Sequence, residues 1–161
     1  MCEYCGCQAI EAIDVLTREH DHVVNLIGEV RTAHAADDVD QMAVLAQRIA
    51  VILQPHTVVE EEGLFPLLAD EFPEHVDALR AEHRQVEQVL AAAAQATPAD
   101  PRWPDQLMVT LEMLREHILK EQDGVFPAAL TNLTGDDWDI VDAVRARTGT
   151  RLPGSPSAIV N

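Results

Sequence analysis

The strongest constraint on the fold is a phrase that the chain contains twice. Residues 56–68 read H-T-V-V-E-E-E-G-L-F-P-L-L, and residues 117–130 read H-I-L-K-E-Q-D-G-V-F-P-A-A-L. Both copies contain His-x-x-x-Glu, followed by Gly, an aliphatic residue, Phe and Pro. A shorter phrase, Leu-x-x-Glu-His-x-x-Val, precedes each copy at residues 16–23 and 79–86. The repeated unit is therefore a pair of helices, and this period decides the architecture.

Apolar residues on the first helix of each unit follow a helical period. In residues 13–34 and 76–93 they recur at alternating spacings of three and four, as on the buried stripe of an amphipathic helix. Pro73 is suited to open the third helix, and the fourth should end near residues 126–127 or one turn beyond. The sequence therefore predicts an all-α fold, an up-down four-helix bundle with a short additional C-terminal helix.

Turn-forming and helix-breaking residues predict where the other helices end. The Asp pair at 37–38 predicts a turn and an N-cap for the second helix. Pro55 predicts a kink, or an end one residue before the first His-x-x-x-Glu, and the Gly and Pro at 63 and 66 predict the end of that helix. The prolines of residues 97–104 predict a loop.

The chain is predicted to form one domain. A length of 161 residues is enough to bury a core, and 47% hydrophobic with 24% charged residues is typical of a globular protein. The fifth helix should pack across one end of the bundle, and the Gly-, Pro- and Ser-rich C-terminus should be mobile. The predicted segments are a Cys-containing N-terminal segment (1–8), the four-helix bundle (9–133), the short fifth helix (134–148) and a flexible tail (149–161).

The composition excludes several classes of partner. A formal net charge of −17 opposes binding to nucleic acid or to an anionic membrane surface. No stretch approaches the roughly 20 apolar residues of a membrane span, and the N-terminus lacks the features of a signal peptide. All three cysteines lie near the N-terminus and cannot link distant parts of the fold, which is typical of a reducing compartment. We therefore predict a cytoplasmic protein.

The repeated His and Glu residues have the spacing of metal ligands. Residues four apart on a helix project side by side, so each His-x-x-x-Glu presents an imidazole and a carboxylate to the same point. Four imidazoles and two carboxylates are costly to bury unpaired, whereas two bridged metal ions, iron or manganese, would satisfy them. The alternative, core histidines beside solvated glutamates, explains one such residue but not the repeated set. The predicted ligands are His20, His56, Glu60, His83, His117 and Glu121.

These residues resemble the hemerythrin-like (HHE cation-binding) proteins, over roughly Leu16 to Leu130. The resemblance implies a four-helix bundle around a non-haem diiron centre that reacts with oxygen, peroxide or nitric oxide. It also implies two iron ions with oxo or hydroxo and carboxylate bridges. By the same resemblance, His20 and His83 are terminal ligands, Glu60 and Glu121 are the bridging carboxylates, and there is no catalytic residue beyond the metal centre.

The chain departs from the oxygen-carrying hemerythrins at two positions. The third helix of the carriers resembles His-x-x-x-His, but the position four before His83 is Leu79. The carriers also have Asp five after the last His, where this chain has Gln122 and uses Glu121 instead. A missing ligand would leave an open position on one iron, which favours chemistry over reversible storage. The side chains that could fill that position instead are Tyr4, His75 and Glu87.

Other side chains near the repeats have weaker claims to the site. Glu87 stands four after His83 and is a candidate for an additional ligand or an outer hydrogen-bond partner, with a solvated charge as the alternative. Glu19 and Glu82 directly precede their histidines and are expected to be helix-surface charges. The phenylalanines of the two Phe-Pro steps should close the bundle around the centre. The histidines expected outside the site are His22, His34 and His75.

The N-terminal cysteines form a separate candidate site. Cys2, Cys5 and Cys7 offer three thiols that could bind a metal or take part in redox chemistry. Three thiols are one short of a closed tetrahedral site, and flexible exposed thiols without a function are the alternative.

Three functions follow from these observations. The first is a diiron oxidoreductase, peroxidase-like, catalase-like or nitric-oxide-handling, that reacts with a small oxidant in oxidative or nitrosative stress or iron homeostasis. The second is an iron or oxygen sensor, or an iron donor for iron-sulfur cluster repair, which requires a redox or iron-accepting protein partner. The third is reversible oxygen storage, which Leu79 disfavours.

Overall fold

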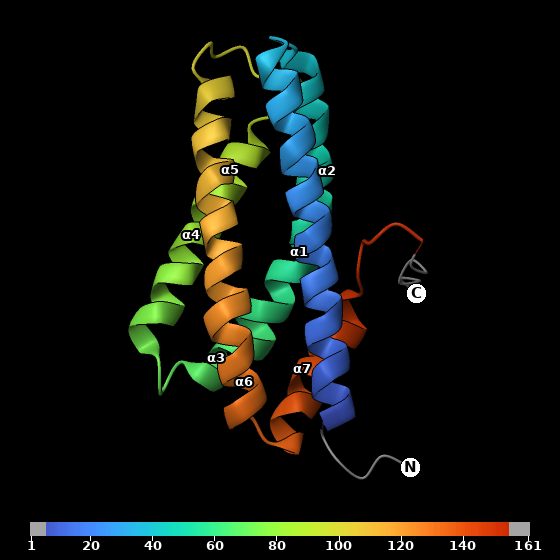
Figure 1. Cartoon of the computed structure of the whole chain (residues 1–161), viewed down its shortest axis with the longest axis vertical. Helices are drawn as coiled ribbons and strands as arrows, with labels where there is room; N and C mark the ends of the chain where they lie inside the picture. The colour runs from blue at the N-terminus through green and yellow to red at the C-terminus, as the bar shows by residue number, and fades with distance from the viewer. Residues whose placement is uncertain (1–5, 155–161) are drawn as a thin grey trace.

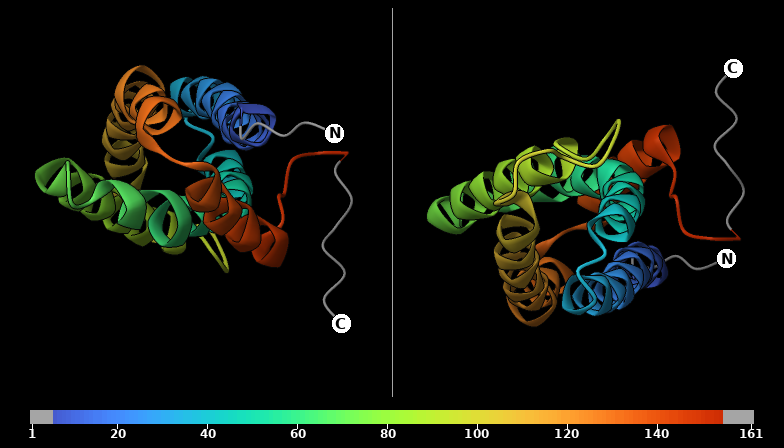
Figure 2. Two further views of the ribbon diagram at one scale, coloured as in Figure 1. Left: turned by 90° about the horizontal axis from the view of Figure 1, so that it is seen from below. Right: turned by 90° about the horizontal axis from the view of Figure 1, so that it is seen from above.

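Four long helices form the frame of the molecule. The computed structural model describes residues 6–154, and all of the regular structure in that range is helical. α1 packs against α2 and α5, and α4 packs against the same two helices, so the four enclose a common interior (Figure 1, Figure 2). The predicted all-α fold is confirmed. The long helices are α1 (Gly6–Ala35), α2 (Val39–Val58), α4 (Pro73–Ala91) and α5 (Trp103–Lys120).

Two of the long helices continue through a wide, π-helical turn into a further helical segment. α2 does not end at Pro55, as one reading of the sequence predicted, but runs through it to Val58. Pro55 is buried, and packing there outweighs the one hydrogen bond that proline removes. The Gly and Pro at 63 and 66 do not end the helix either. The continuations are η1 (Val59–Leu64) and α3 (Phe65–Leu68) after α2, and η2 (Glu121–Val125) and α6 (Phe126–Asn132) after α5.

Local chemistry sets the other helix ends. Asp38 caps α2 by accepting a hydrogen bond from the backbone N–H of Gln41 at 3.1 Å, as the Asp pair predicted. α4 begins at Pro73, also as predicted. The loop predicted for residues 97–104 extends too far, because α5 begins at Trp103. Pro104 therefore falls in the first helical turn, where its missing N–H has no helical partner to lose.

The short fifth helix is α7 (Gly135–Thr148). It begins with a capping box, in which the side chains of Thr134 and Asp137 each accept a hydrogen bond from the other residue's backbone N–H. Its buried side chains include Trp138 and Val141. They pack α7 against α1, α2 and η1, at the end of the bundle where α1 begins (Figure 1).

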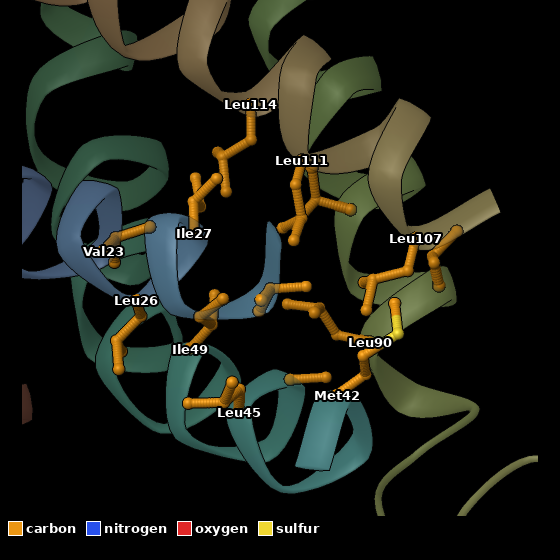
Figure 3. Close-up of a cluster of buried hydrophobic side chains, with 14 of the residues drawn as sticks. Val23, Leu26, Ile27, Met42, Leu45, Ile49, Leu90, Leu107, Leu111 and Leu114 are labelled. Carbon is orange, nitrogen blue, oxygen red and sulfur yellow. The ribbon is translucent and has the colours of Figure 1, made fainter. Parts of the chain in front are cut away.

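The core consists of two apolar clusters with a polar layer between them. One cluster combines residues of α1, α2, α4 and α5, whose side chains point toward one another between the helices (Figure 3). The other is built at the opposite end from α3, α6, α7 and the ends of the long helices, around Trp138. On α1, Leu16 belongs to the second cluster and Val23 to the first, so His20 lies between them.

One segment, Val39–Leu68, is long and apolar enough by length and composition to cross a membrane. The prediction that no stretch approaches such a span is therefore wrong for this segment. However, 56% of its most apolar 18-residue window is buried inside the protein, as in the core helix of a soluble protein. A buried core helix passes the same test of length and composition, so this segment is only weak evidence for a membrane span.

Candidate metal centre

The six predicted ligands converge in the polar layer. His20 comes from α1 and His83 from α4, and each of the other two long helices contributes its His-x-x-x-Glu at the junction with a π turn. All six residues are buried, with at most 6% of their surface exposed. Their ligand atoms form two overlapping groups that share Glu60 and Glu121. Position A adds His20 and His56, and position B adds His83 and His117.

Each shared glutamate faces one imidazole from each position. Glu60 Oε1 lies 3.0 Å from His56 Nε2, and its Oε2 lies 3.2 Å from His83 Nε2. Glu121 Oε1 lies 2.8 Å from Nε2 of the histidine four residues before it and 3.4 Å from Nε2 of the histidine on α1. A carboxylate that lies between two sets of imidazoles has the placement of a bridging ligand.

The glutamates of the two Leu-x-x-Glu-His phrases contact the histidines of the longer phrase. Glu19 Oε1 lies 3.4 Å from His56 Nδ1, and Glu82 Oε2 lies 2.6 Å from His117 Nδ1. The prediction that both are helix-surface charges is wrong for Glu19, which is buried, and incomplete for Glu82, which is partly exposed but also contacts His117. A residue about 100° from the buried stripe faces the neighbouring helix when four helices pack in a ring. The available signal was that Glu precedes His in both copies of the phrase.

A third outer carboxylate comes from η1. Glu61 Oε1 lies 3.0 Å from His83 Nδ1. A carboxylate accepts a hydrogen only from a protonated nitrogen, so each of these contacts places the proton on Nδ1 and leaves Nε2 free to bind a metal. His20 differs, because its Nδ1 is buried and has no hydrogen-bond partner among the described residues.

Several buried atoms of the polar layer lack a hydrogen-bond partner among residues 6–154. Such atoms are costly to bury unless another group binds them. Imidazole nitrogens with carboxylate oxygens are a donor set for transition-metal cations such as iron and manganese. The arrangement therefore fits metal ions. The unpartnered atoms are both ring nitrogens of His20, Nε2 of His117, and both carboxylate oxygens of Glu60 and of Glu121.

The charges in the polar layer also favour a bound cation. Burial by itself lowers the pKa of both His56 and His83. Glu60 outweighs it together with the other carboxylates around each ring, raising the pKa of His83 to about 9 and that of His56 well above its usual value. Burial raises the pKa of Glu60, and the two histidines reverse this and hold it well below its usual range. The buried carboxylate of Glu60 thus requires positive charge beside it, which protonated histidines supply when no metal ion does.

Each π turn has a local cause in the repeat. The N–H of Phe65 donates to the carbonyl of Glu60, five residues earlier, rather than to that of Glu61. Pro66 has no N–H, so the carbonyl of Glu61 lacks the next donor of this series, and Arg80 Nη2 donates to it at 3.3 Å. η2 has the same long bond between its own Phe and Glu. Gly-x-Phe-Pro therefore reshapes the helix instead of ending it.

The π turns bring a phenylalanine ring onto one imidazole of each position. In an uninterrupted α-helix the residue five after a glutamate would lie about 140° around the axis from it. The wider turn returns it to the same side. Phe65 stacks on His83 with the ring centroids 5.7 Å apart, and Phe126 stacks on His20 at 5.5 Å. Both rings are buried and cover the imidazoles.

A cavity of about 500 Å³ between α2 and α4 connects the surface with the polar layer. Apolar side chains line most of its wall, and all four ligand histidines border it. Glu61, Glu62 and Glu87 also line it. Glu87 is exposed and belongs to neither position, so the structure does not place it as a ligand. The cavity gives a small molecule a route to the histidines.

The other sequence-predicted residues lie apart from the two positions. Leu79 is buried in the second apolar cluster, and His75, a candidate to replace the missing ligand, is exposed and contacts Phe72. His34 lies 2.9 Å from Asp105 near the far end of the bundle. His22 is half-buried beside a surface pocket, and Cys7 is exposed in the first turn of α1. The predicted residues outside the described range are Cys2, Tyr4 and Cys5.

The fifth helix reaches the metal centre through Glu19, which the sequence did not indicate. Arg145 Nη1 lies 3.7 Å from Glu19 Oε1, and the hydroxyl of Thr150 donates to Glu19 Oε2 at 3.2 Å. Burial lowers the pKa of Arg145 despite the acidic groups beside it. Nothing in the local sequence marks Arg145, because its position depends on how α7 packs.

Comparison with known proteins adds a family to this geometry. The family model described as hemerythrin HHE cation binding domain matches residues 11–129, which contain all six converging residues. Neither the curated proteins nor the solved structures gave a match to the chain. The family match spans most of the chain and agrees with the helical fold and the two His/Glu groups. The chain therefore belongs to the hemerythrin HHE cation-binding domain family.

Proposed function

We propose that this protein holds two iron ions, one at position A and one at position B, and that it binds and reduces a small oxidant such as oxygen, hydrogen peroxide or nitric oxide. The observation that carries the proposal is that each of two buried carboxylates faces one imidazole from each position. The closed ring of helix contacts supports the up-down order of the four long helices that this site requires.

We assign a role to each group of residues around positions A and B. Bound iron would supply the electrons and the open coordination position for the oxidant. Glu60 and Glu121 would hold both ions, and the carboxylates at the Nδ1 atoms would fix the orientation of the imidazoles. The cavity between α2 and α4 would admit the oxidant. Phe65 and Phe126 would keep water from the covered faces of their histidines.

The proposal places the protein in the cytoplasm, without nucleic acid or membrane as a partner. A net charge of −17 supports this, since both of those surfaces are anionic. The apolar helix that could span a membrane by composition is mostly buried and carries ligands of the proposed site, which also supports it.

The test combines metal content with reactivity. We expect close to two iron ions per chain after iron-replete expression, and an optical spectrum that changes on anaerobic reduction and returns when oxidant is added. Stopped-flow mixing of the reduced protein with oxygen, peroxide or nitric oxide would rank the three oxidants. A protein that takes up no iron, or whose reduced form reacts with none of them, would contradict the proposal. Transfer of its iron to an apo iron-sulfur protein would instead favour the donor role.

A further inference from the structure

Positions A and B differ in how many of their imidazoles are held by an outer carboxylate. At position B both are held: His83 Nδ1 lies 3.0 Å from Glu61, and His117 Nδ1 lies 2.6 Å from Glu82. At position A only His56 is held, at the longer distance of 3.4 Å from Glu19. The second imidazole there, His20, has a buried Nδ1 without a partner among the described residues.

The reason for this difference is visible in the repeat. When the two long phrases are aligned on their shared glutamates, Glu61 corresponds to Gln122. Both residues directly follow the shared glutamate, at the start of a π turn, and Gln122 is half-buried. Glu61 contacts the ring of His83 on the neighbouring helix. The alignment therefore pairs Gln122 with His20, whose Nδ1 makes no hydrogen bond among the described residues. The first copy supplies a carboxylate there and the second supplies a neutral amide.

An outer carboxylate strengthens a histidine as a metal ligand, because it orients the ring and increases the electron density on the nitrogen that binds the metal. Losing one such partner typically weakens metal binding about 10–100-fold. Neighbouring cations do not reverse the comparison. Glu82 is paired with Lys120, and Glu19 has Arg145 at 3.7 Å, so each position has one outer carboxylate beside a cation.

We propose that the two metal positions have unequal affinity, that position B fills first, and that the ion at position A is the exchangeable one, with Gln122 as the residue responsible. This inference rests on the proposed two-ion site and goes beyond it. It predicts a form of the protein that holds one ion at His83 and His117 while position A remains available to a second ion.

The test is a titration of the full-length, metal-free protein with Co²⁺, followed by calorimetry and by fluorine NMR of protein labelled with fluorophenylalanine. The chain has three phenylalanines. Phe65 covers His83 at position B, Phe126 covers His20 at position A, and Phe72 contacts neither. Since Co²⁺ is paramagnetic and the two positions share Glu60 and Glu121, both signals should respond to each ion. We expect the first equivalent to broaden the Phe65 signal more strongly than the Phe126 signal, and the second to broaden the Phe126 signal more strongly. The two affinities should differ about 10–100-fold.

Substitutions at the aligned pair make the test specific. Gln122→Glu should strengthen binding at position A about tenfold or more and bring the two steps together, whereas Glu61→Gln should weaken position B by a similar factor. The double variant should reverse which of the Phe65 and Phe126 signals broadens more strongly with the first equivalent. Glu87→Gln, at an exposed position in the same cavity, is the matched control and should change neither step.

The outcomes separate this inference from the proposed function. Two ions bound with equal affinity, a Phe126 signal that broadens more strongly with the first equivalent in the unaltered protein, or a Gln122→Glu variant with an unchanged second step would each overturn the inference while leaving the two-ion site intact. A chain that never binds a second ion would overturn the proposed function itself.

Discussion

The two copies of the repeat are alike around the shared glutamates and differ in the residues that surround this inner set. Both have the π turn, the stacked phenylalanine and the His-x-x-x-Glu pair. Only the first is covered by α7: a side chain added at Gly63 would meet the backbone of Val141 at 3.4 Å, whereas Gly124 has nothing within 4 Å. The two shared glutamates thus have the same local structure in both copies, whereas the residues that surround them differ.

The outer glutamates show the same divergence. Glu19 is 1% exposed, and its neighbours are Arg145 and Thr150 from the C-terminal part of the chain. Glu82 is partly exposed and pairs with Lys120 at the surface. Equivalent residues therefore hold equivalent histidines, one as part of the core and the other as part of the surface.

The shared glutamates should give the largest effect, and the same effect in both copies. Glu60→Ala or Glu121→Ala removes a group that contributes to both positions, so we expect loss of two-ion binding, beyond the roughly 10–100-fold loss caused by removing an outer partner. Metal analysis after dialysis would measure this. Glu62→Ala, at an exposed site on the same turn as Glu60, is the control and should keep its metal. A stable, fully loaded Glu60→Ala would contradict the bridging role.

The outer glutamates should give a smaller effect that differs between the copies. Glu19→Gln leaves the guanidinium of Arg145 without the charge nearest to it inside the protein, whereas Glu82→Gln leaves Lys120 in contact with water. We expect Glu19→Gln to lower the free energy of unfolding of the metal-free protein by about 1–3 kcal/mol more than Glu82→Gln does. Urea denaturation monitored by circular dichroism would measure it.

A double variant identifies the cause of that difference. Adding Arg145→Met to Glu19→Gln removes the unpaired charge and should recover part of the lost stability. If Glu19→Gln and Glu82→Gln lowered the free energy of unfolding equally, the contact of Glu19 with α7 would not be the cause of a difference between the two copies.

The glycines should give the smallest difference. Gly63→Leu places a side chain against Val141 and Val144 and should cost about 1–3 kcal/mol by forcing α7 away, whereas Gly124→Leu should stay within about 0.5 kcal/mol of the unaltered protein. Thermal unfolding of the two variants side by side is the measurement. A Gly124→Leu variant as unstable as Gly63→Leu would show that the turn itself, and not its contact with α7, requires glycine.

The features that are present in both copies of the repeat could be predicted from the sequence, whereas those that depend on tertiary packing could not. The helices and the six converging residues follow from period and spacing, because both are properties of a single helix. The contacts of Glu19 and Glu82 with histidines were missed because they are made to a neighbouring helix. Arg145 carries no local signal at all, since its contact with Glu19 exists only once α7 has packed against the bundle.

The π turns were missed for a different reason. Gly and Pro usually end helices, and nothing in residues 63–66 alone shows that a wider turn can absorb them. The bond from the N–H of Phe65 to the carbonyl of Glu60 uses the last donor before Pro66, and the side chain of Arg80 supplies the donor that proline lacks. That compensation comes from α4, where Arg80 lies 19 positions after Glu61 in the sequence.

The π turns also make chain length part of the metal site. Deleting one residue from η1 or η2 would remove the extra residue of the wide turn, and the phenylalanine, then four after the glutamate, would stay on the same side of an ordinary α-helix. Inserting one residue there would instead rotate everything after it by about 100° and turn the phenylalanine away from its histidine. A deletion between α4 and α5, by contrast, falls in a surface connection whose length costs little to change. Two homologous chains with identical ligands would therefore differ at the site if one of them had a single inserted residue between the glutamate and the phenylalanine.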